Sequence, residues 1–437
     1  MATEKQLHNG GASGVLYTDR RDFYVDPQVT KELWTDVAPF TTLISNQESR
    51  DVPDPIFKMF EHRNPWVKQE FSINDGSPTA IPNDNVGNSA TLAIDGIVGL
   101  AATPDSSYIG LTVEVWNEAK TTKKGTAIVS AVTSAELTMK STKAAAITLV
   151  DDDVCIVIGN ARGEGSSSPD AWSDELSVVW NSTQIFKTPL QVTGTLEAAV
   201  LRGESNELAR LRRMKAQEHK VQKEKAFLFG ARVGGTKLSG STDSFADGGR
   251  TDADGNLIRS TYGIISAVED YGASTGDDQA NFSIQEDDYT YADFVDDMEK
   301  VFQYVPESGV KRAFCGSGAL GYWSKLGTGN TITGQSGWTV NVGDMKRDSL
   351  GFNYRTLETP HGMLQLIPTP SLRGPYNKTM LVVSDDNLFH AQYRPMVYQA
   401  NIKTDNAFDG VKDQYMSDEG VGIQLIESHK LFKITAS

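Results

Sequence analysis

The chain has 437 residues, of which 39% are hydrophobic, so it is long enough for two or three domains with ordinary buried cores. Its formal net charge of −16 at pH 7 repels phosphate, which excludes a general nucleic-acid-binding protein and leaves room only for local contacts with DNA. No apolar run approaches the roughly 20 residues of a membrane span, and the N-terminus lacks the apolar stretch of a signal peptide. We therefore expect no membrane partner and folding in a reducing cytoplasm.

The N-terminal part of the chain combines a polar arm with short elements. Residues 1–22 are polar and rich in glycine, which predicts a mobile arm. Tyr24–Ile44 predicts a short helix and an extended segment, closed by a turn at Pro39–Thr41. Phe57–Ile73 predicts a strand interrupted near Pro65, and turn-forming residues fill positions 74–91. At these turn-forming residues, a long inserted segment of the chain is predicted to begin.

Short strands with alternating apolar residues fill the next segment. Five such runs follow one another with the spacing of a small antiparallel barrel or sandwich: IGLTVEVW, TAIVSAV, ELTMK, ITLV and DVCIVIG. We therefore predict an inserted all-β module at about 92–159. The segments on its two sides, Phe57–Ile73 and Leu176–Val192, are expected to pair as the two legs of one ribbon.

The longest helix signal in the chain spans Thr193–Gly230 and contains no proline. Ser205 is a good N-cap residue, Gly203 is expected to mark a kink, and Gly230 supplies a C-terminal stop. From Ser205 onward the helix would be about 35 Å long. One apolar stripe is predicted from the recurrence of Leu208, Leu211, Met214, Val221 and Leu228.

The same helix concentrates positive charge in an otherwise acidic chain. Between positions 210 and 225 it has seven Lys and Arg residues and two Glu residues, 7 − 2, which gives a local charge of +5. A charge run of this kind is usually a solvated helix face. The alternative is a surface that faces a polyanion.

The C-terminal half alternates helices and strands, as in a compact α+β unit. A loop rich in Gly, Ser, Thr and Asp occupies residues 231–259 and precedes it. A helix is predicted over Tyr289–Tyr304, with its apolar side formed by Phe294, Val295, Met298, Val301 and Phe302. The runs VGIQLIE and HKLFKI are expected to form a final hairpin around Ser428.

The sequence offers no support for catalysis. It lacks the motifs GxxxxGK[ST], HExxH and CxxC, and its six histidines have no ligand spacing. The segment Asp252–Asn256 lacks the first and last ligands of a calcium loop. Cys155 and Cys315 lie in apolar, strand-like segments and are expected to be small buried hydrophobic residues. We expect a protein that is not an enzyme, with no cofactor, no metal site and no catalytic residue.

The order of these parts resembles that of the major capsid proteins of tailed bacteriophages with the Hong Kong 97-type fold. The string VTGTLEAAVLRGESNELARLRRMKAQEHKVQKEKAFLFG is similar to the segment that enters and forms the spine helix in one large branch of these proteins. Further similarity lies in PFTTLI, in RSTYGIISAVED, and in DNLFHAQYRPMVYQANIKTDNAFDG followed by IQLIESHKLFKI. Together these segments extend over most of the chain.

The resemblance implies an α+β capsid fold with an inserted all-β module. The N-terminal arm and lead-in would occupy residues 1–55, and the extended loop 56–192. The spine helix and peripheral domain would follow at 193–260, the axial domain at 261–385, and the return strands of the peripheral domain at 386–437. The module at about 92–159 exceeds what a simple extended loop needs, so it is expected to be an insertion domain.

As function, the resemblance implies a self-assembling subunit of an icosahedral phage head, built from hexamers and pentamers that enclose double-stranded DNA. The implied partners are other copies of the chain, a separate scaffolding protein, a portal protein, an optional decoration protein, and packaged DNA through weak local contacts. The implied location is the virion shell, after synthesis and assembly in the bacterial host cytoplasm. The alternative is an encapsulin-like shell protein of a cellular nanocompartment with the same fold.

The resemblance also implies two sets of candidate site residues. Inter-subunit contacts of the extended loop are expected at Arg63, Trp66, Lys68, Glu70, Phe186 and Lys187, although alternating strand faces of an ordinary kind would look the same. A basic helix face toward the lumen and DNA is expected at Arg210, Arg212, Arg213, Lys215, Lys220 and Lys223.

Overall fold

The computed structural model divides the chain into two compact units. The main unit consists of Met1–Met59 and Val178–Ser437, and the barrel unit of Phe60–Ser177. The structure describes residues 38–47, 49–62, 69–83, 85, 88–134, 136–166, 176–198, 207–232, 254, 256, 258–272, 279–304, 309–329, 342–347, 353–402 and 409–435. The predicted arm at 1–22 lies outside them. Within these ranges no helix has an apolar run long enough to cross a membrane.

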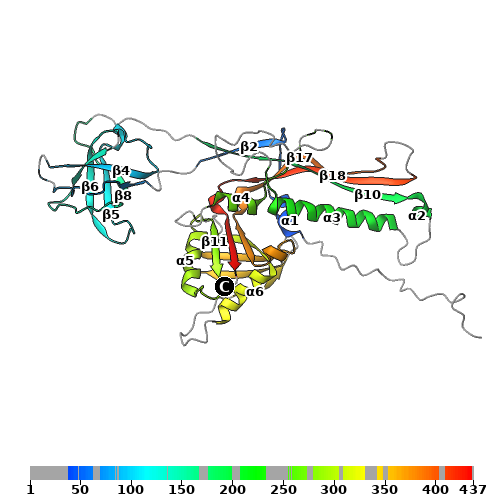
Figure 1. Ribbon diagram of the computed structural model, residues 1–437. Helices are drawn as coiled ribbons and strands as arrows, with labels where there is room; N and C mark the ends of the chain where they lie inside the picture. The colour runs from blue at the N-terminus through cyan, green and yellow to red at the C-terminus, as the bar shows by residue number, and fades with distance from the viewer. Residues whose placement is uncertain are drawn as a thin grey trace, which may run out of the picture. The chain divides into compact units, whose positions relative to one another are not determined.

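The barrel unit contains a closed antiparallel barrel with the strand order β3-β4-β7-β6-β5-β8 (Figure 1). The strands are β3 (Glu70–Ile73), β4 (Ala90–Val98), β5 (Leu111–Trp116), β6 (Lys123–Val132), β7 (Glu136–Ser141) and β8 (Val154–Asn160). Alternate side chains fill its interior, among them Phe71, Leu92, Tyr108, Val113 and Leu137.

This barrel is the predicted all-β module, and it extends beyond residues 92–159. β3 belongs to it because Phe71 and Ile73 point into the barrel core, where both are fully buried. The run ITLV does not form a strand, since Ile147 makes only an isolated bridge with Ile81. Of the two predicted architectures, barrel and sandwich, the barrel is observed.

The predicted ribbon exists only over a short length. β2 (Ile56–Glu61) and β9 (Ser177–Ser182) form a two-stranded sheet. The remainder of each leg pairs elsewhere: β3 lies in the barrel, and β10 (Gln184–Thr193) joins a different sheet. The prediction of one continuous ribbon was therefore wrong, because alternation along a strand does not identify the strand's neighbour.

The main unit contains a seven-stranded sheet with the order β11-β19-β16-β12-β15-β14-β13. Its strands are β11 (Asn281–Gln285), β12 (Val310–Cys315), β13 (Val342–Arg347), β14 (Asn353–Thr359), β15 (Gly362–Pro368), β16 (Thr379–Val383) and β19 (Lys430–Thr435). Short 3-10 turns occur at Ser106–Tyr108 in the barrel unit and at Gly374–Tyr376, Asp385–Asn387 and Ile426–Ser428 in the main unit.

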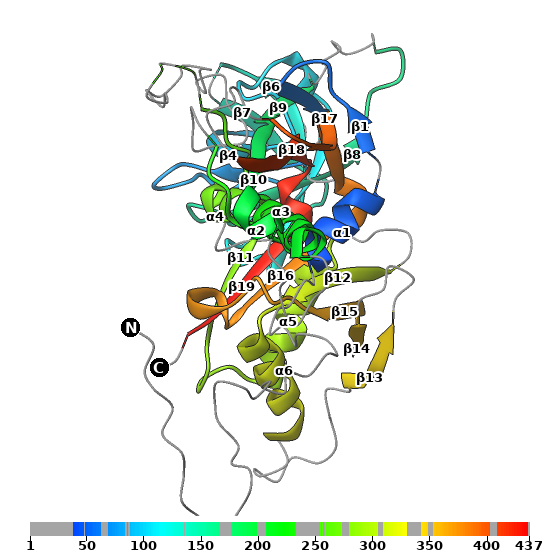
Figure 2. The same ribbon diagram turned by 90° about the vertical axis from the view of Figure 1, so that its right-hand side faces the viewer.

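Separate hydrophobic cores cover the two faces of this sheet. Helices α5 (Tyr291–Val301) and α6 (Ser317–Gly329) pack on one face (Figure 2), where Phe294 and Trp323 meet Phe432. On the other face, α4 (Ile264–Tyr271) and α1 (Pro39–Asn46) share a core with strand residues of the sheet. The predicted apolar side of the helix around Phe294 is confirmed.

A four-stranded sheet with the order β1-β17-β18-β10 completes the main unit. Its remaining strands are β1 (Ser49–Asp51), β17 (Leu388–Gln399) and β18 (Gly410–Ile423). The long helix α3 (Glu207–Phe229) runs along β10 and β18 (Figure 1), and the short helix α2 (Gly194–Ala198) precedes it. Gly230 ends α3 as predicted, whereas Gly203 and Ser205 lie outside the described residues.

Two local predictions were wrong. Pro39–Thr41 is the first turn of α1 rather than a turn that closes a segment, because proline fits the first helical position, where its missing N–H has no intrahelical partner. The final hairpin around Ser428 does not form. β18 pairs with β17 and β10, whereas β19 pairs with β11 and β16 in the other sheet.

Candidate functional site

Helix α3 faces the four-stranded sheet with a stripe that is polar over most of its length. Its buried side chains are His219, Lys223, Glu224, Phe227 and Leu228. Spacings of three and four residues place them on one side of the helix. The predicted apolar stripe is confirmed only at Leu228, since Leu208, Leu211, Met214 and Val221 are half-buried. The four-stranded sheet opposite α3 presents polar groups, which accounts for the polar rather than apolar character of the buried stripe.

His219 connects α3 to two neighbouring strands. Its Nδ1 atom lies 2.9 Å from the Thr188 hydroxyl of β10, and its Nε2 atom lies 3.0 Å from the Ser417 hydroxyl of β18. Burial, assisted by the nearby charge of Lys223, lowers the pKa of His219 to about 4. The ring is therefore neutral at pH 7, so that one nitrogen donates a hydrogen bond and the other accepts one.

One turn later, α3 contributes to a buried ion-pair cluster. Lys223 Nζ lies 3.0 Å from Glu419 Oε2 of β18, and His390 Nε2 of β17 lies 3.1 Å from the same oxygen. Burial alone would raise the pKa of Glu419, but the His390 hydrogen bond and the Lys223 charge outweigh burial and lower it. Removing either charge would leave the other buried without compensation.

Near its N-terminal end, α3 is joined to the sheet through Asp413. Arg212 Nη2 lies 2.8 Å from Asp413 Oδ2, and the guanidinium lies 5.4 Å from the ring centre of Tyr398. Asp413 also accepts hydrogen bonds from the Tyr398 hydroxyl and from the amide of Asn401. Burial acts to raise the pKa of Asp413, but these hydrogen bonds and the Arg212 charge hold it below its usual range.

Most of the predicted basic helix face is neutralised by carboxylates. The ion pairs join Arg210 to Glu207, Arg212 to Asp413, Lys215 to Glu218 and Lys223 to Glu419. Lys223 is only 7% exposed, so it cannot belong to a surface that contacts DNA. Arg213 and Lys220 are exposed, as is the neighbouring Lys225.

The predicted contact residues Phe186 and Lys187 lie on opposite faces of β10. Phe186 is 5% exposed and packs edge-on against His219 and Phe227 of the same chain, so it is a core residue. Lys187 is exposed on the face turned away from α3, here called the open face. Its paired neighbour there is Met416 of β18, which in turn pairs with the exposed Val397 of β17.

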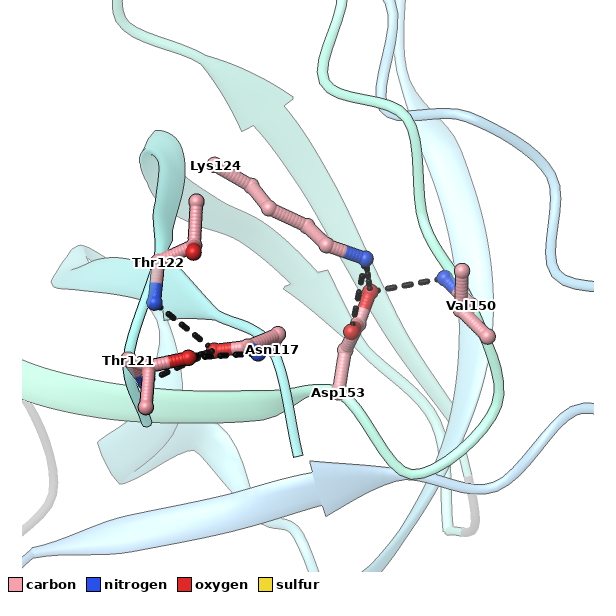
Figure 3. A network of polar contacts seen from close by, with 6 residues as sticks. All are labelled: Asn117, Thr121, Thr122, Lys124, Val150 and Asp153. Atoms are coloured by element: carbon pink, nitrogen blue, oxygen red, sulfur yellow. Dashed lines mark hydrogen bonds and ion pairs between the residues drawn. The ribbon is translucent and has the colours of Figure 1, made fainter. Parts of the chain in front are cut away.

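In the barrel unit, Glu70 begins β3 and forms an ion pair with Lys120 at 2.8 Å. Lys120 belongs to a tight turn between β5 and β6. The side-chain oxygen of Asn117 holds this turn by accepting hydrogen bonds from the amides of Thr121 and Thr122, both at 2.8 Å (Figure 3). Glu70 is thus half-buried and paired within its own unit.

Beside this turn, Asp153 forms a second polar contact set of the barrel (Figure 3). It is 2% exposed, and its two carboxylate oxygens lie 2.6 and 2.7 Å from Lys124 Nζ. The amide of Val150 donates to Asp153 at 2.7 Å. The contacts fix the loop before β8 against β6.

The other three predicted contact residues, Arg63, Trp66 and Lys68, lie outside the described residues. Both cysteines are buried and free, as predicted, and burial raises the thiol pKa of each above its usual value. Within the described ranges, no group of three or more His, Cys, Asp or Glu side chains is arranged to hold a metal ion.

Sequence reasoning missed the polar groups that attach α3 to the sheet. Glu224 was counted only as a charge on the helix, yet it is fully buried. A usable signal was present, since His219, Lys223 and Phe227 recur at intervals of four and Glu224 adjoins that line. The apolar stripe was sought among aliphatic residues alone.

Comparison with known proteins identifies the family. A family model described as SU10 major capsid protein matches residues 34–414 of the chain. The major capsid protein of Pseudomonas phage PaMx41 is 29% identical over 154 residues, which are 35% of this chain and 32% of that protein. The chain thus matches about a third of the length of this curated relative.

Several solved shell structures show weak similarity to the chain. The capsid of a native GTA particle has a TM-score of 0.41 and 8% identity, with 96% of this chain and 97% of that chain covered. The structure of Mycobacterium phage Bobi has a TM-score of 0.41 and 7% identity, with 96% of each chain covered. The SrpI encapsulin of Synechococcus elongatus has a TM-score of 0.37 and 8% identity, with 61% and 77% covered.

TM-scores of this size do not establish a common fold, so the assignment depends on the sequence match. That match covers well over half of the chain. The chain belongs to the SU10 major capsid protein family.

Proposed function

We propose that this protein is the shell-forming subunit of a tailed-bacteriophage head. The observation that carries the proposal is the match of residues 34–414 to a family of major capsid proteins. The sequence lacks the motifs GxxxxGK[ST], HExxH and CxxC, which agrees with a structural rather than an enzymatic role. Copies of the chain assemble into hexamers and pentamers, which close into an icosahedral shell around double-stranded DNA.

The shell subunit has a Hong Kong 97-type fold. The four-stranded sheet with α3 corresponds to the peripheral domain and its spine helix, and the seven-stranded sheet with α5 and α6 to the axial domain. The barrel unit is an insertion within the extended loop. The order of the elements along the chain supports this correspondence.

The open face of the four-stranded sheet is a contact surface between subunits. Its exposed apolar residues include Ile185, which is 42% exposed, and Val397, which is 43% exposed; Lys187 follows Ile185 on β10, and Met416 lies between Lys187 and Val397 in the sheet. Apolar residues gathered on one exposed sheet face are typical of interaction sites. Arg63, Trp66, Lys68 and Glu70 remain proposed contact residues of the extended loop.

Contacts with packaged DNA are weak and local. Among the predicted basic residues, Arg213 and Lys220 are exposed and can reach a polyanion, whereas the ion pairs of Arg212 and Lys223 with strand carboxylates serve the fold. The double change Arg213→Glu and Lys220→Glu is expected to leave empty-shell assembly intact and to reduce the DNA packaged per particle. Unchanged DNA content would remove Arg213 and Lys220 from this role.

The remaining partners follow from shell assembly. They are a separate scaffolding protein, a portal protein and an optional decoration protein. The virion shell is the final location, after assembly in the host cytoplasm. The encapsulin-like alternative has no specific observation in its favour, since the matching family is one of phage capsid proteins.

Sedimentation of the expressed chain tests shell assembly. The full chain is produced alone and together with the scaffolding gene product from the same genome. Particles that sediment far faster than the 47.6 kDa chain are expected in at least one preparation. A single species of that mass in both preparations would contradict the proposal.

A further inference from the structure

The N-terminus of helix α1 receives its cap from another helix. The N-cap position is occupied by Ala38, and no side chain of α1 itself caps the first turn. Instead, Glu224 of α3 accepts a hydrogen bond from the amide of Thr41 at 2.9 Å. The other carboxylate oxygen of Glu224 lies 3.5 Å from the Ser371 hydroxyl. One buried carboxyl therefore joins α1, α3 and the loop after β15.

Glu224 has no ion-pair partner within the described part of the chain, and its side chain is 0% exposed. The segment PFTTLISN of α1 contains no charged residue, and Ser371 contributes only a hydroxyl. On α3, Lys220 lies one turn earlier and acts on Glu224 weakly, as the last of several contributions. His390 of β17 and Glu419 of β18 form the neighbouring cluster with Lys223.

Two opposing energies act on this carboxyl group. The ionised form accepts amide hydrogen bonds at a helix N-terminus, which favours negative charge. Burial without a counter-ion disfavours the same form more strongly, and it raises the pKa of Glu224 to about 7. Separation of α1 from α3 would admit water to the carboxyl group, so the ionised form favours the separated state relative to the protonated form.

We propose that Glu224 is a proton-controlled latch, which holds α1 firmly against α3 when protonated and weakens this docking when ionised. Weaker docking of α1 would also affect the four-stranded sheet, because α1 leads into β1 and contacts β17. Since Phe40, Leu43 and Ile44 keep α1 in the main core, ionisation raises the frequency of opening rather than unfolding the unit.

Hydrogen exchange of the unassembled full chain measures this latch directly. The peptide that contains α1 is followed by mass spectrometry between pH 5.5 and 8, with each rate corrected for the intrinsic pH dependence of exchange. A shift of the carboxyl pKa from 4.5 to about 7 predicts that the opening equilibrium of α1 rises about 25-fold over this range. Strand β6 of the barrel unit, which lies in the unit without Glu224, serves as the internal reference and should stay constant.

Matched variants identify the responsible group. Glu224→Gln keeps the shape and the hydrogen-bond acceptor but cannot ionise, so the protection of α1 should become independent of pH. Glu218→Gln, at a half-exposed position of α3, and His390→Gln should both retain the 25-fold change. The proposal is overturned if Glu224→Gln keeps the pH dependence. It is also overturned if α1 and β6 respond equally in the unmodified chain, a comparison that needs no variant.

Discussion

At the scale of single residues, the buried pair of Lys223 and Glu419 shows why the charge pattern of α3 was misleading. The sequence pattern placed Lys223 among the basic residues of an exposed helix face. Its neighbours in the fold come from β17 and β18, about 170 to 200 positions later in the chain, and no local sequence pattern predicts them. Cys155 and Cys315, in contrast, were predicted correctly because their apolar neighbours lie on either side in the sequence.

Lys223→Met is expected to destabilise the main unit, because Glu419 would lose its buried counter-ion. Breaking a buried ion pair by removing one partner costs about 3–5 kcal/mol. Lys215→Met, which removes a half-exposed pair on the same helix, should cost at most about 0.5 kcal/mol. Thermal melting of both variants checks this, and equal shifts would contradict the assignment.

Acid stability provides a second test at this scale. Because the folded pKa of Glu419 is lowered, its ionised form adds stability that is complete above the unfolded value of 4.5 and is lost as the pH falls through the lower folded value. Glu419→Gln should therefore be less stable than the unmodified chain at pH 6, and this difference should shrink towards pH 3. A difference in melting temperature that stays constant with pH would disprove the role of ionised Glu419.

At the scale of elements, the end of α3 is set by a close backbone approach. A Cβ at Gly230 would lie 2.3 Å from Thr261 O, and a Cβ at Gly263 would lie 2.5 Å from Gly230 N. The two glycines therefore let the C-terminus of α3 meet the start of α4. The sequence predicted the stop at Gly230 from its residue type, but it did not predict that another segment packs directly on it.

Gly230→Ala should consequently lower the melting temperature of the main unit, because backbone atoms rather than mobile side chains obstruct the methyl group. Gly321→Ala in α6 is the matched control. No atom lies within 4 Å of its Cβ position, and alanine favours a helix interior by roughly 0.5–1 kcal/mol over glycine. The two substitutions should thus shift the melting temperature in opposite directions, and a shift of the same sign would refute the packing argument.

Pairing between elements was predicted less well than the elements themselves. The helix around Phe294 was found from periodicity, since its signal is local, whereas β13 was not predicted. The hairpin of β18 with β19 was wrong because two apolar strands close in sequence were assumed to be neighbours. Leu425, with a φ of 47°, and the 3-10 turn after it instead carry the chain from one sheet to the other.

At the scale of the whole molecule, the chain has two units with separate cores, and the density of short strands in the sequence indicated an all-β segment within one of them. The barrel boundaries were too narrow because β3 is separated from β4 by a long stretch of turn residues. Arg63, Trp66 and Lys68 remain predictions, as does the arrangement of subunits in a shell.

Asp153→Ala should destabilise the barrel unit alone. The change removes a buried carboxylate that accepts from Lys124 and from the Val150 amide, and hydrogen bonds to charged groups contribute about 1.5–3 kcal/mol. Calorimetry of the full chain should show the transition of the barrel unit at a lower temperature and that of the main unit unchanged. Asp151→Ala, at an exposed site in the same loop, is the control. An equal shift of both units would contradict their energetic independence.

The central claim, that this chain builds a phage shell, is tested most directly by negative-stain electron microscopy of the full chain expressed alone and with its scaffolding protein. Closed shells or capsomer rings are predicted, and Val397→Asp on the open face, opposite the uncharged Met416, should suppress them without lowering the melting temperature of the main unit. Monodisperse monomers of the unmodified chain under both conditions would contradict the claim and would turn attention to the barrel unit as a binding domain.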